Sequence, residues 1–471
     1  MSRKPHVVVL GGGPAGCGAA YQLRRLDRAD VTLIERQGHF GGNAGSFEWA
    51  GQWLDFGSHR LHYTTEPAIL ADIRSLLDGD LLERKRNGHI VLRGRRVRFP
   101  FKPVDLVMRL DKRFAAGVMF DMAASTVRKR GGGNSSGGTY ADVLMRSLGP
   151  TICESFYFPY ARKIWGHEPE ALSGIQAQRR VTANSFGKLI KRVLKPVGGG
   201  MFYYPRRGFG QITTSFANAA RQQGAEMLLN TNVDRLEAPV GADGRWKVHV
   251  SQQGTKRVLD ADYVWSTIPI TMLARLTSTA PPELAASAPG IDYRAMLLVY
   301  LQLDVDQFTP TDAHYFPEAA TTMTRLSEPK NYSDLATPMG STVLCAELPC
   351  APGDSTWSMS DEDLGKLVAR DIRAAGLPLA RPPVAVHVKR LRHAYPIYLT
   401  GYEHSFDAHD AWASRQPRML TFGRQGLFAH DNTHHALYMA YCAAECLVDG
   451  TFDKAMWEKY RRIFATHVVE D

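Results

Sequence analysis

The sequence predicts an α/β fold in which a Rossmann-like dinucleotide-binding domain is combined with a discontinuous α+β substrate-binding domain. Three features predict it: an apolar strand over 6–10 that runs into a glycine-rich turn, a helical pattern over 15–26, and a second apolar strand over 31–34. A strand, a helix and a strand within about 30 residues make a βαβ unit. The 471 residues suffice for two or three domains.

The turn after the first strand has the pattern GxGxxG, in which each glycine has its own physical role. Gly11 permits the tight turn, Gly13 lets a pyrophosphate approach the backbone, and Gly16 allows the helix to pack closely on the strand. Pro14 and Ala15 open the helix, where free N–H groups and the helix dipole favour a phosphate. The turn therefore predicts dinucleotide binding.

Later apolar segments supply further strands, at 227–229, 232–236, 262–268, 296–303 and 342–348. We expect the dinucleotide-binding domain to combine residues 1–95, 200–270 and 385–471. The substrate-binding domain then combines 96–199 and 271–384. The glycine-rich stretch 131–138 predicts a flexible joint after a helical pattern over 104–127. The site should lie between the domains, at the carboxyl ends of the parallel strands.

The formal charge of +10 narrows the choice of partners. Basic runs such as 93–98 and 188–195 suit nucleic acid, an anionic membrane surface or an anionic substrate. No recognition motif accompanies them, so we expect a small-molecule substrate, with an anionic one as an option, and no nucleic acid. Peripheral membrane contact through 104–127 is less favoured than packing of that helix on its own domain. Without a span of about 18 apolar residues or a signal peptide, we expect a cytoplasmic protein.

The six cysteines form no CxxC pair. Cys442 and Cys446 share one helical face, and the only nearby candidates for further metal ligands are His434 and His435. Burial as small apolar side chains is the more common state of free cysteine, so we predict no metal site.

Glu35 ends the second strand, where a carboxylate accepts hydrogen bonds from ribose hydroxyls. It is followed by Arg36 and by the doublet Gly41 and Gly42, with Asn43 next. This order resembles the FAD-binding signature of the amine oxidase and protoporphyrinogen oxidase superfamily, which also contains the UDP-galactopyranose mutases. The resemblance implies FAD as the cofactor. We expect it to be non-covalent, because no Cys or His matches a tethering motif.

Further segments resemble the same superfamily, thinly and over most of the chain. Those that the resemblance places against the flavin are Gly57, Ser58, His59, Val233, Gly423, Arg424, Asp431 and Asn432. Arg424 can offer a fork of donors to a phosphate or a flavin carbonyl. Asp431 and Asn432 stand where a helix would begin, and amides there could polarise the pyrimidine end of the flavin.

The expected activity is transfer of a hydride from a small polar or sugar-like metabolite to flavin N5, with His59 and His62 as candidate bases. A mutase-like alternative isomerises a sugar nucleotide without net redox change. A third possibility is a non-catalytic flavin-binding protein. The segment 154–166 is similar to an aromatic, basic helix of the mutases, and a second mutase arginine has no clear counterpart. The residues expected to bind substrate are Tyr157, Tyr160, Arg162, Arg180 and Tyr398.

Overall fold

The computed structural model describes residues 3–99, 138–180, 200–241 and 243–469, with positions 112, 114, 116, 117, 120 and 121 between the first two ranges. Most of the predicted helix over 104–127, the joint up to residue 137 and the side chain of Arg180 lie outside the described residues. Within the described part, no helix is long and apolar enough to cross a membrane.

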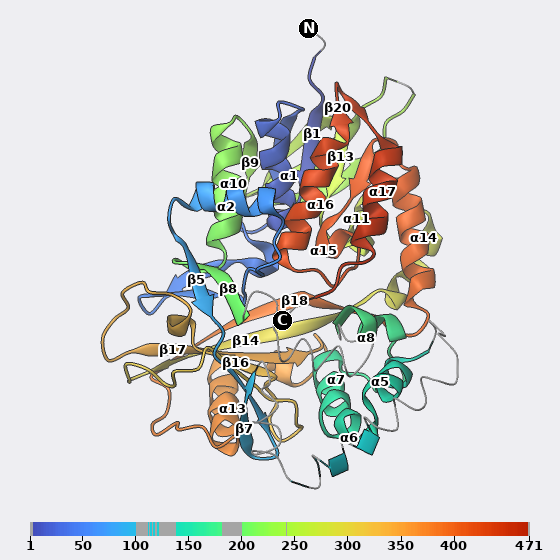
Figure 1. Cartoon of the computed structure of the whole chain (residues 1–471). Coiled ribbons are helices and arrows are strands. Elements are labelled where there is room, and N and C mark those ends of the chain that lie inside the picture. Colours follow the sequence, from blue (N-terminus) through green and yellow to red (C-terminus); the bar gives the residue numbers. More distant parts are fainter. Residues whose placement is uncertain are drawn as a thin grey trace.

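The upper half of the molecule in Figure 1 is built on a five-stranded parallel sheet of order β19-β13-β1-β2-β9. Its strands are β1 (His6–Leu10), β2 (Asp30–Ile34), β9 (Glu226–Leu228), β13 (Tyr263–Ser266) and β19 (Met419–Thr421). All neighbours pair in parallel. Val7, Val8 and Val9 are fully buried, as expected of a parallel strand covered on both faces. The predicted Rossmann-like unit is confirmed.

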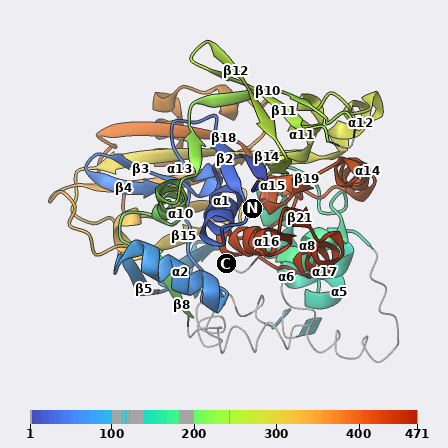
Figure 2. The ribbon, with the colours of Figure 1, turned by 90° about the horizontal axis from the view of Figure 1, so that it is seen from above.

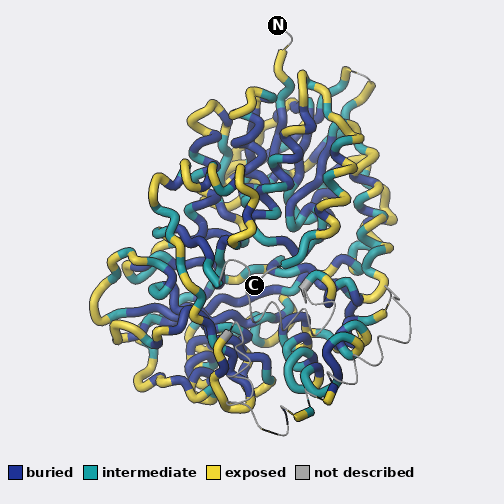
Figure 3. The backbone as a smooth tube through the Cα atoms, in the orientation of Figure 1, coloured by how far each residue is buried: buried dark blue, intermediate teal, exposed yellow. Residues whose placement is uncertain are grey.

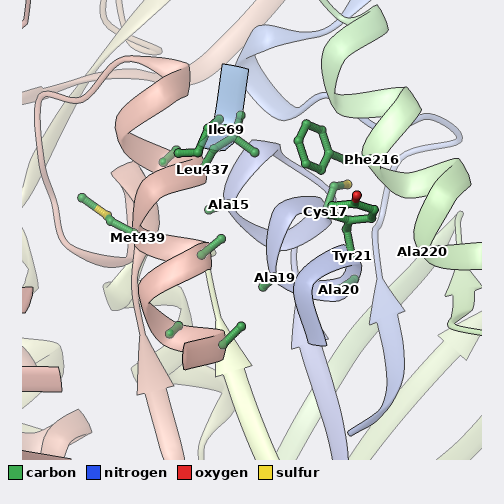
Figure 4. Packing of buried hydrophobic residues seen from close by; sticks show 14 of the residues in the cluster. Ala15, Cys17, Ala19, Ala20, Tyr21, Ile69, Phe216, Ala220, Leu437 and Met439 are labelled. Atoms are coloured by element: carbon green, nitrogen blue, oxygen red, sulfur yellow. The ribbon is translucent and has the colours of Figure 1, made fainter. Parts of the chain in front are cut away.

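One face of this sheet is covered by helices α1 (Pro14–Arg25), α10 (Gln211–Gln222) and α16 (Thr433–Glu445). Small side chains on α1 let its neighbours approach closely (Figure 4). A Cβ at Gly18 would lie 2.8 Å from Leu437 of α16, and Tyr21 meets Phe216 of α10 edge to face at 5.1 Å. Helices α2 (Pro67–Leu77) and α17 (Lys454–Phe464) complete this layer, with the short hairpin β20 (Leu447–Val448) and β21 (Thr451–Phe452).

The opposite face is covered by an antiparallel ribbon, as the view from above shows (Figure 2). The ribbon consists of β10 (Thr231–Glu237), β11 (Trp246–Gln252) and β12 (Thr255–Ala261). It packs with helices α11 (Ile270–Leu276), α12 (Pro282–Ser287) and α14 (Tyr402–Arg415). The upper half is therefore three-layered.

The lower half contains a seven-stranded sheet of order β18-β14-β17-β16-β15-β6-β7. Its strands are β6 (Gly88–Leu92), β7 (Arg95–Phe99), β14 (Asp292–Leu303), β15 (Ala313–Tyr315), β16 (Arg325–Ser327), β17 (Thr342–Cys350) and β18 (Ala385–Ile397). Only β15 and β6 pair in parallel among these strands. Odd residues of β14 such as Leu297 and Val299 pack against α13 (Asp361–Ala374), whereas even ones such as Leu298 face the upper half.

Two segments that the sequence analysis groups with the dinucleotide-binding domain contribute strands to this sheet. The segment 88–95 contains β6 and the first residue of β7, and 385–397 is β18. The physical reason is antiparallel pairing: β6 forms a hairpin with β7, and β18 pairs along β14. No local sequence pattern at these positions specifies which sheet the strands join, because strand pairing is a long-range property.

A helical insert lies beside the mixed sheet in the lower half of Figure 1. It comprises α5 (Tyr140–Leu148), α6 (Pro150–Ile152), a π-helical turn (Cys153–Tyr157), α7 (Phe158–Trp165) and α8 (Gly174–Arg180). Thr139 and Asp142 form a capping box at the start of α5.

Three smaller elements connect the two halves. They are the hairpin β3 (Ser46–Trp49) and β4 (Gln52–Asp55), the pair β5 (Leu81–Lys85) and β8 (Met201–Pro205), and the turn α15 (Gly423–Gly426). Buried backbone runs through the sheets of both halves and exposed backbone lies mainly at the periphery (Figure 3).

Candidate functional site

A cavity of about 790 Å³ lies between the two halves. It opens at the carboxyl ends of β1 and β2 and is closed below by strand β18 of the mixed sheet. This is the place expected for a ligand of an open parallel sheet. Its volume is that of a small-molecule or cofactor site.

The glycine-rich turn forms one wall of the cavity. Gly11 has φ +105°, and a Cβ at Gly16 would lie 1.9 Å from the carbonyl oxygen of Gly11, so the helix can only start here with glycine at both positions. A Cβ at Gly13 would meet nothing closer than 3.9 Å, so its backbone faces open space. No side chain caps the first turn of α1. The first-turn amides are therefore available to an anion.

Glu35 is held at the end of β2 by two backbone amides. The N–H of Gly12 donates to Oε2 and the N–H of Gln37 donates to Oε1, each at 2.8 Å. The carboxylate keeps lone pairs for further donors, which suits a pair of ribose hydroxyls.

The opposite wall is organised by a bulge in β18. Arg294 and Met296 of β14 pair with Tyr395 and Leu391, so residues 392–394 bulge out of the ladder. Two carbonyl oxygens of the bulge then accept hydrogen bonds from side chains of the upper half. His393 O accepts from Asn43 Nδ2 at 2.7 Å and from Gln425 Nε2 at 2.8 Å.

Arg424 donates to the other bulge carbonyl, Ala394 O, at 2.7 Å and to Asp431 O at 3.3 Å. Its guanidinium lies over the ring of Tyr395, 5.0 Å from the centroid. Gly423, with φ +77°, makes the turn, and a Cβ there would lie 2.7 Å from Cβ of Ala15 in α1. The glycine-rich turn and the Arg424 segment, more than 400 residues apart in sequence, thus line one cavity.

His59 lies in the cavity wall with a defined tautomer. Its Nε2 is 2.9 Å from Phe56 O and 3.0 Å from Asn43 O, and two carbonyl acceptors require that this nitrogen carries the proton. Burial, aided by the charge of Arg325, lowers the pKa of His59 to about 4. The imidazole is therefore neutral near pH 7, with its lone pair on Nδ1.

Below His59, one cross-strand row of the mixed sheet reaches the cavity through its two outer members, Lys389 and Arg325. Register places Lys389 opposite Leu298, Leu298 opposite Glu347, and Glu347 opposite Arg325. Arg325 and Glu347 form a buried bidentate pair, with both contacts at 2.8 Å. The turn at Gly57 sits directly on this row, since its Cβ would lie 3.1 Å from Glu347 Oε1.

A second, enclosed chamber of about 30 Å³ adjoins the main cavity through Arg325 and Tyr395. Tyr160 of α7 and Tyr315 of β15 line it as well. The chamber is therefore bounded by three phenol rings and one oriented guanidinium.

Positive charge dominates the main cavity. Lys389 is half-buried with its ammonium 3.7 Å from the ring centroid of Phe56, and burial lowers its pKa. The two acidic lining residues, Glu35 and Asp431, already interact with amides and histidines respectively. The basic lining residues are Arg36, Arg60, Arg86, Arg325, Lys389, Arg390, Arg392 and Arg424.

The structure brings most predicted cofactor contacts together. The predicted residues that line the cavity are Gly11, Gly13, Pro14, Ala15, Glu35, Arg36, Gly42, Asn43, Ser58, His59, Val233, Arg424, Asp431 and Asn432. Gly16, Gly57 and Gly423 lie behind this lining and set the backbone path.

Several of the other predicted residues lie elsewhere. His62 is outside the cavity lining, with Nδ1 2.7 Å from Thr64 Oγ1. Arg162 is exposed and pairs with Glu168 at 2.6 Å. Tyr160 and Ile164, four residues apart on α7, face the chamber, so Arg162 between them points away.

The two remaining aromatic candidates belong to the packing of the protein. Tyr398 is buried, donates to Phe428 O at 2.8 Å and stacks on Tyr402 at 4.3 Å. Tyr157 packs edge to face on Phe156 at 4.9 Å. Neither lines the main cavity or the chamber.

Sequence reasoning missed the row of the mixed sheet. Arg325, Glu347 and Lys389 stand in three strands with no motif around them, and only strand register brings them together. The one usable signal was a charged residue in otherwise apolar strands, as with Glu347 in β17.

Comparison with known proteins agrees with this geometry. The family described as flavin containing amine oxidoreductase matches residues 14–445. Reduced UDP-galactopyranose mutase is similar over 99% of this chain and 100% of its own, with a TM-score of 0.82 and 20% identity. Putrescine oxidase is similar over 94% of this chain and 98% of its own, with a TM-score of 0.67 and 16% identity. Cyclohexylamine oxidase from Brevibacterium oxydans IH-35A is similar over 98% of this chain and 100% of its own, with a TM-score of 0.67 and 15% identity. At these identities the likeness shows a shared fold, which oxidases and a mutase have in common.

Proposed function

Because the chain belongs to the flavin containing amine oxidoreductase family, we propose that it is an FAD-dependent oxidoreductase whose hydride donor is a small anionic metabolite, polar or sugar-like. The observation that carries the proposal is the charge of the cavity, which is lined by eight Lys or Arg residues and two engaged acids. Arg60, Arg325 and Arg390 pair with carboxylates outside the lining, and the excess of positive charge remains after these pairs are counted. Like charges brought together at a binding site cost several kcal/mol. A cationic amine would therefore be disfavoured here.

The residues present fit FAD. The uncapped first turn of α1 and the open backbone of Gly13 suit the pyrophosphate, and Glu35 suits the ribose. When bound, the flavin would supply the redox step by accepting a hydride at N5. Gln425 Oε1 is a buried acceptor with no hydrogen-bond partner within the described residues, and it suits an N–H or O–H donor of a ligand. Non-covalent binding of the FAD is part of the proposal.

Arg325 is the residue that we expect to receive the anionic group of the substrate. Glu347 takes the Nε and Nη2 donors and so fixes the plane of the guanidinium, while Nη1 remains for another acceptor. Tyr160, Tyr315 and Tyr395 around it would limit the group to a small one.

His59 is the candidate base for a donor that loses a hydroxyl proton with its hydride. Its Nδ1 lone pair follows from the two carbonyls at Nε2. A pKa of about 4 keeps the ring unprotonated at neutral pH and also makes it a weak base.

A second candidate is isomerisation of a sugar nucleotide by a mutase-like reaction without net redox change. Such a reaction requires no strong protein base for hydride loss, and the same basic lining would receive the diphosphate.

Anaerobic substrate challenge tests the proposal. Purified FAD-loaded protein is mixed with matched compounds that are anionic, neutral or cationic, such as a sugar acid, the parent sugar and an amino sugar, and loss of the oxidised flavin absorption is followed. The proposal expects bleaching by an anionic compound and much less by its partners. Bleaching by amines alone contradicts it. Turnover of a sugar nucleotide only after dithionite reduction, without peroxide in air, assigns the mutase instead.

A further inference from the structure

Three side chains of types that can bind metal ions lie close together at one corner of the main cavity. Asp431 precedes α16, His435 lies in the first turn of that helix, and His467 follows α17. Their ligand atoms all lie within 4.8 Å of one another. The Asp431 side chain is fully buried, and its Oδ2 has no hydrogen-bond partner within the described residues.

The separations suit ligands of one metal ion. Asp431 Oδ1 is 3.4 Å from His435 Nδ1 and 3.1 Å from His467 Nδ1. Bonds of about 2.0–2.1 Å in a tetrahedral site place neighbouring ligand atoms roughly 3.3–3.4 Å apart. Two imidazoles and one carboxylate form the N₂O donor set that binds Zn²⁺ or a related divalent transition ion.

Hydrogen bonding alone leaves the cluster incompletely satisfied. His435 Nδ1 lies 3.2 Å from the N–H of Asn432, which needs a lone pair on that nitrogen. The same nitrogen cannot then donate to Asp431, so two lone pairs face each other across 3.4 Å. A cation between them removes this repulsion. Binding of the ion at His435 Nδ1 would replace the hydrogen bond from Asn432, which is one half of the capping box of α16.

We propose that Asp431, His435 and His467 form a binding site for a divalent transition-metal ion, with Zn²⁺ as its probe. The site would tie the segment after α17 to α16. That segment is already held to α8, because Arg179 Nη1 donates to His467 O at 2.8 Å and Val469 N–H donates to Arg179 O at 3.0 Å. Val469 lines the cofactor cavity, so the ion would fix one of its walls. The site does not depend on the proposed reaction.

The cluster also shows why sequence reasoning predicted no metal. The metal-ligating residues that stand close together in the sequence include Cys442 and Cys446, which are buried and free. Asp431 and His435 have the i, i+4 spacing of one helical face, but His467 joins them only through the fold of the chain end over α16.

The test is Zn²⁺ binding by tag-free, full-length protein after treatment with a chelator, measured in competition with a chromophoric chelator. We expect one Zn²⁺ per chain. Loss of an outer partner of a ligand already costs 10- to 100-fold in affinity, so H435Q and H467Q should each weaken binding by more than about 100-fold. H404Q, which changes an exposed histidine of α14 in the same way, should bind like the wild type. The site is overturned if the wild type binds no Zn²⁺, or if H435Q and H467Q bind Zn²⁺ as tightly as the wild type does.

A spectroscopic measurement keeps the proposal testable if those variants fail to fold. X-ray absorption at the Zn edge of the loaded wild type should show only N and O ligands near about 2.0–2.1 Å, with two imidazoles. A sulfur shell near about 2.3 Å would place the ion on cysteine and contradict the assignment.

Discussion

The two walls of the cavity reach their positions by different means. The wall from the parallel sheet presents backbone: the glycines of the first turn, the uncapped start of α1, and amides that hold Glu35. The wall from the mixed sheet presents the side chains of Lys389 and Arg325, and Glu347 orients Arg325 through two hydrogen bonds. A wall made of backbone is suited to a cofactor common to a family, whereas a wall made of side chains can change with the substrate. The comparison predicts that mutations in the two walls have separable effects.

The largest separation is expected for Arg325→Gln, which should cut catalytic efficiency and leave flavin content near one per chain. In the variant, the anionic group of the substrate loses its charged partner. Losing one member of a buried, hydrogen-bonded charge pair costs about 2–5 kcal/mol, which corresponds to a decrease in catalytic efficiency of roughly 30- to 5,000-fold. Arg325→Lys is the matched control, because it keeps the charge but loses the bidentate geometry. Steady-state kinetics beside flavin absorption measure both effects. If the Arg325→Gln variant lost flavin in parallel with activity, the effects of the two walls would not be separable, and the comparison would be contradicted.

The next largest effect is expected on the backbone wall. Gly16→Ala places a Cβ 1.9 Å from Gly11 O, and overpacking of this kind costs about 1–3 kcal/mol or more. The variant should lose flavin and unfold at lower denaturant concentration. Gly353→Ala is its control, since a Cβ there meets nothing within 4 Å. A Gly16→Ala protein with full flavin and unchanged stability would show that the close approach of helix and strand is not required.

A smaller effect should appear as a pH dependence of stability. Burial lowers the pKa of His59 from 6.5 to about 4 in the folded protein. Between these values the unfolded chain binds a proton that the folded chain does not, so the stabilising contribution is full above pH 6.5 and is lost as the pH falls toward 4. His59→Gln can still donate to Phe56 O and Asn43 O but does not titrate, so its stability should fall less over this range. Denaturant unfolding at several pH values measures the difference, and identical profiles would refute it.

The same contrast explains what could be predicted from the sequence. The turn around Gly13, Glu35 and the segment near Arg424 are local patterns in which order along the chain specifies the geometry, and all three line the cavity. Fold class and family followed from them.

The substrate side could not be predicted in this way. Of the predicted substrate-binding residues, Tyr160 lines the chamber, whereas Arg162 and Tyr398 do not. The position of a residue around its helix, or the face of the strand on which it lies, decides whether its side chain points inward. Arg325 faces Glu347 only through strand register, a long-range property that no local pattern encodes.

The most direct test of the account is the flavin content of purified wild-type and Arg424→Ala protein, read from the absorption spectrum before and after acid precipitation. The account predicts one acid-releasable FAD per chain in the wild type. It predicts markedly less in the variant, because Arg424 fixes the wall that faces the glycine-rich turn. A colourless wild type that takes up no added FAD, or a variant with its full flavin load, would contradict the claim that these two distant segments hold one cofactor.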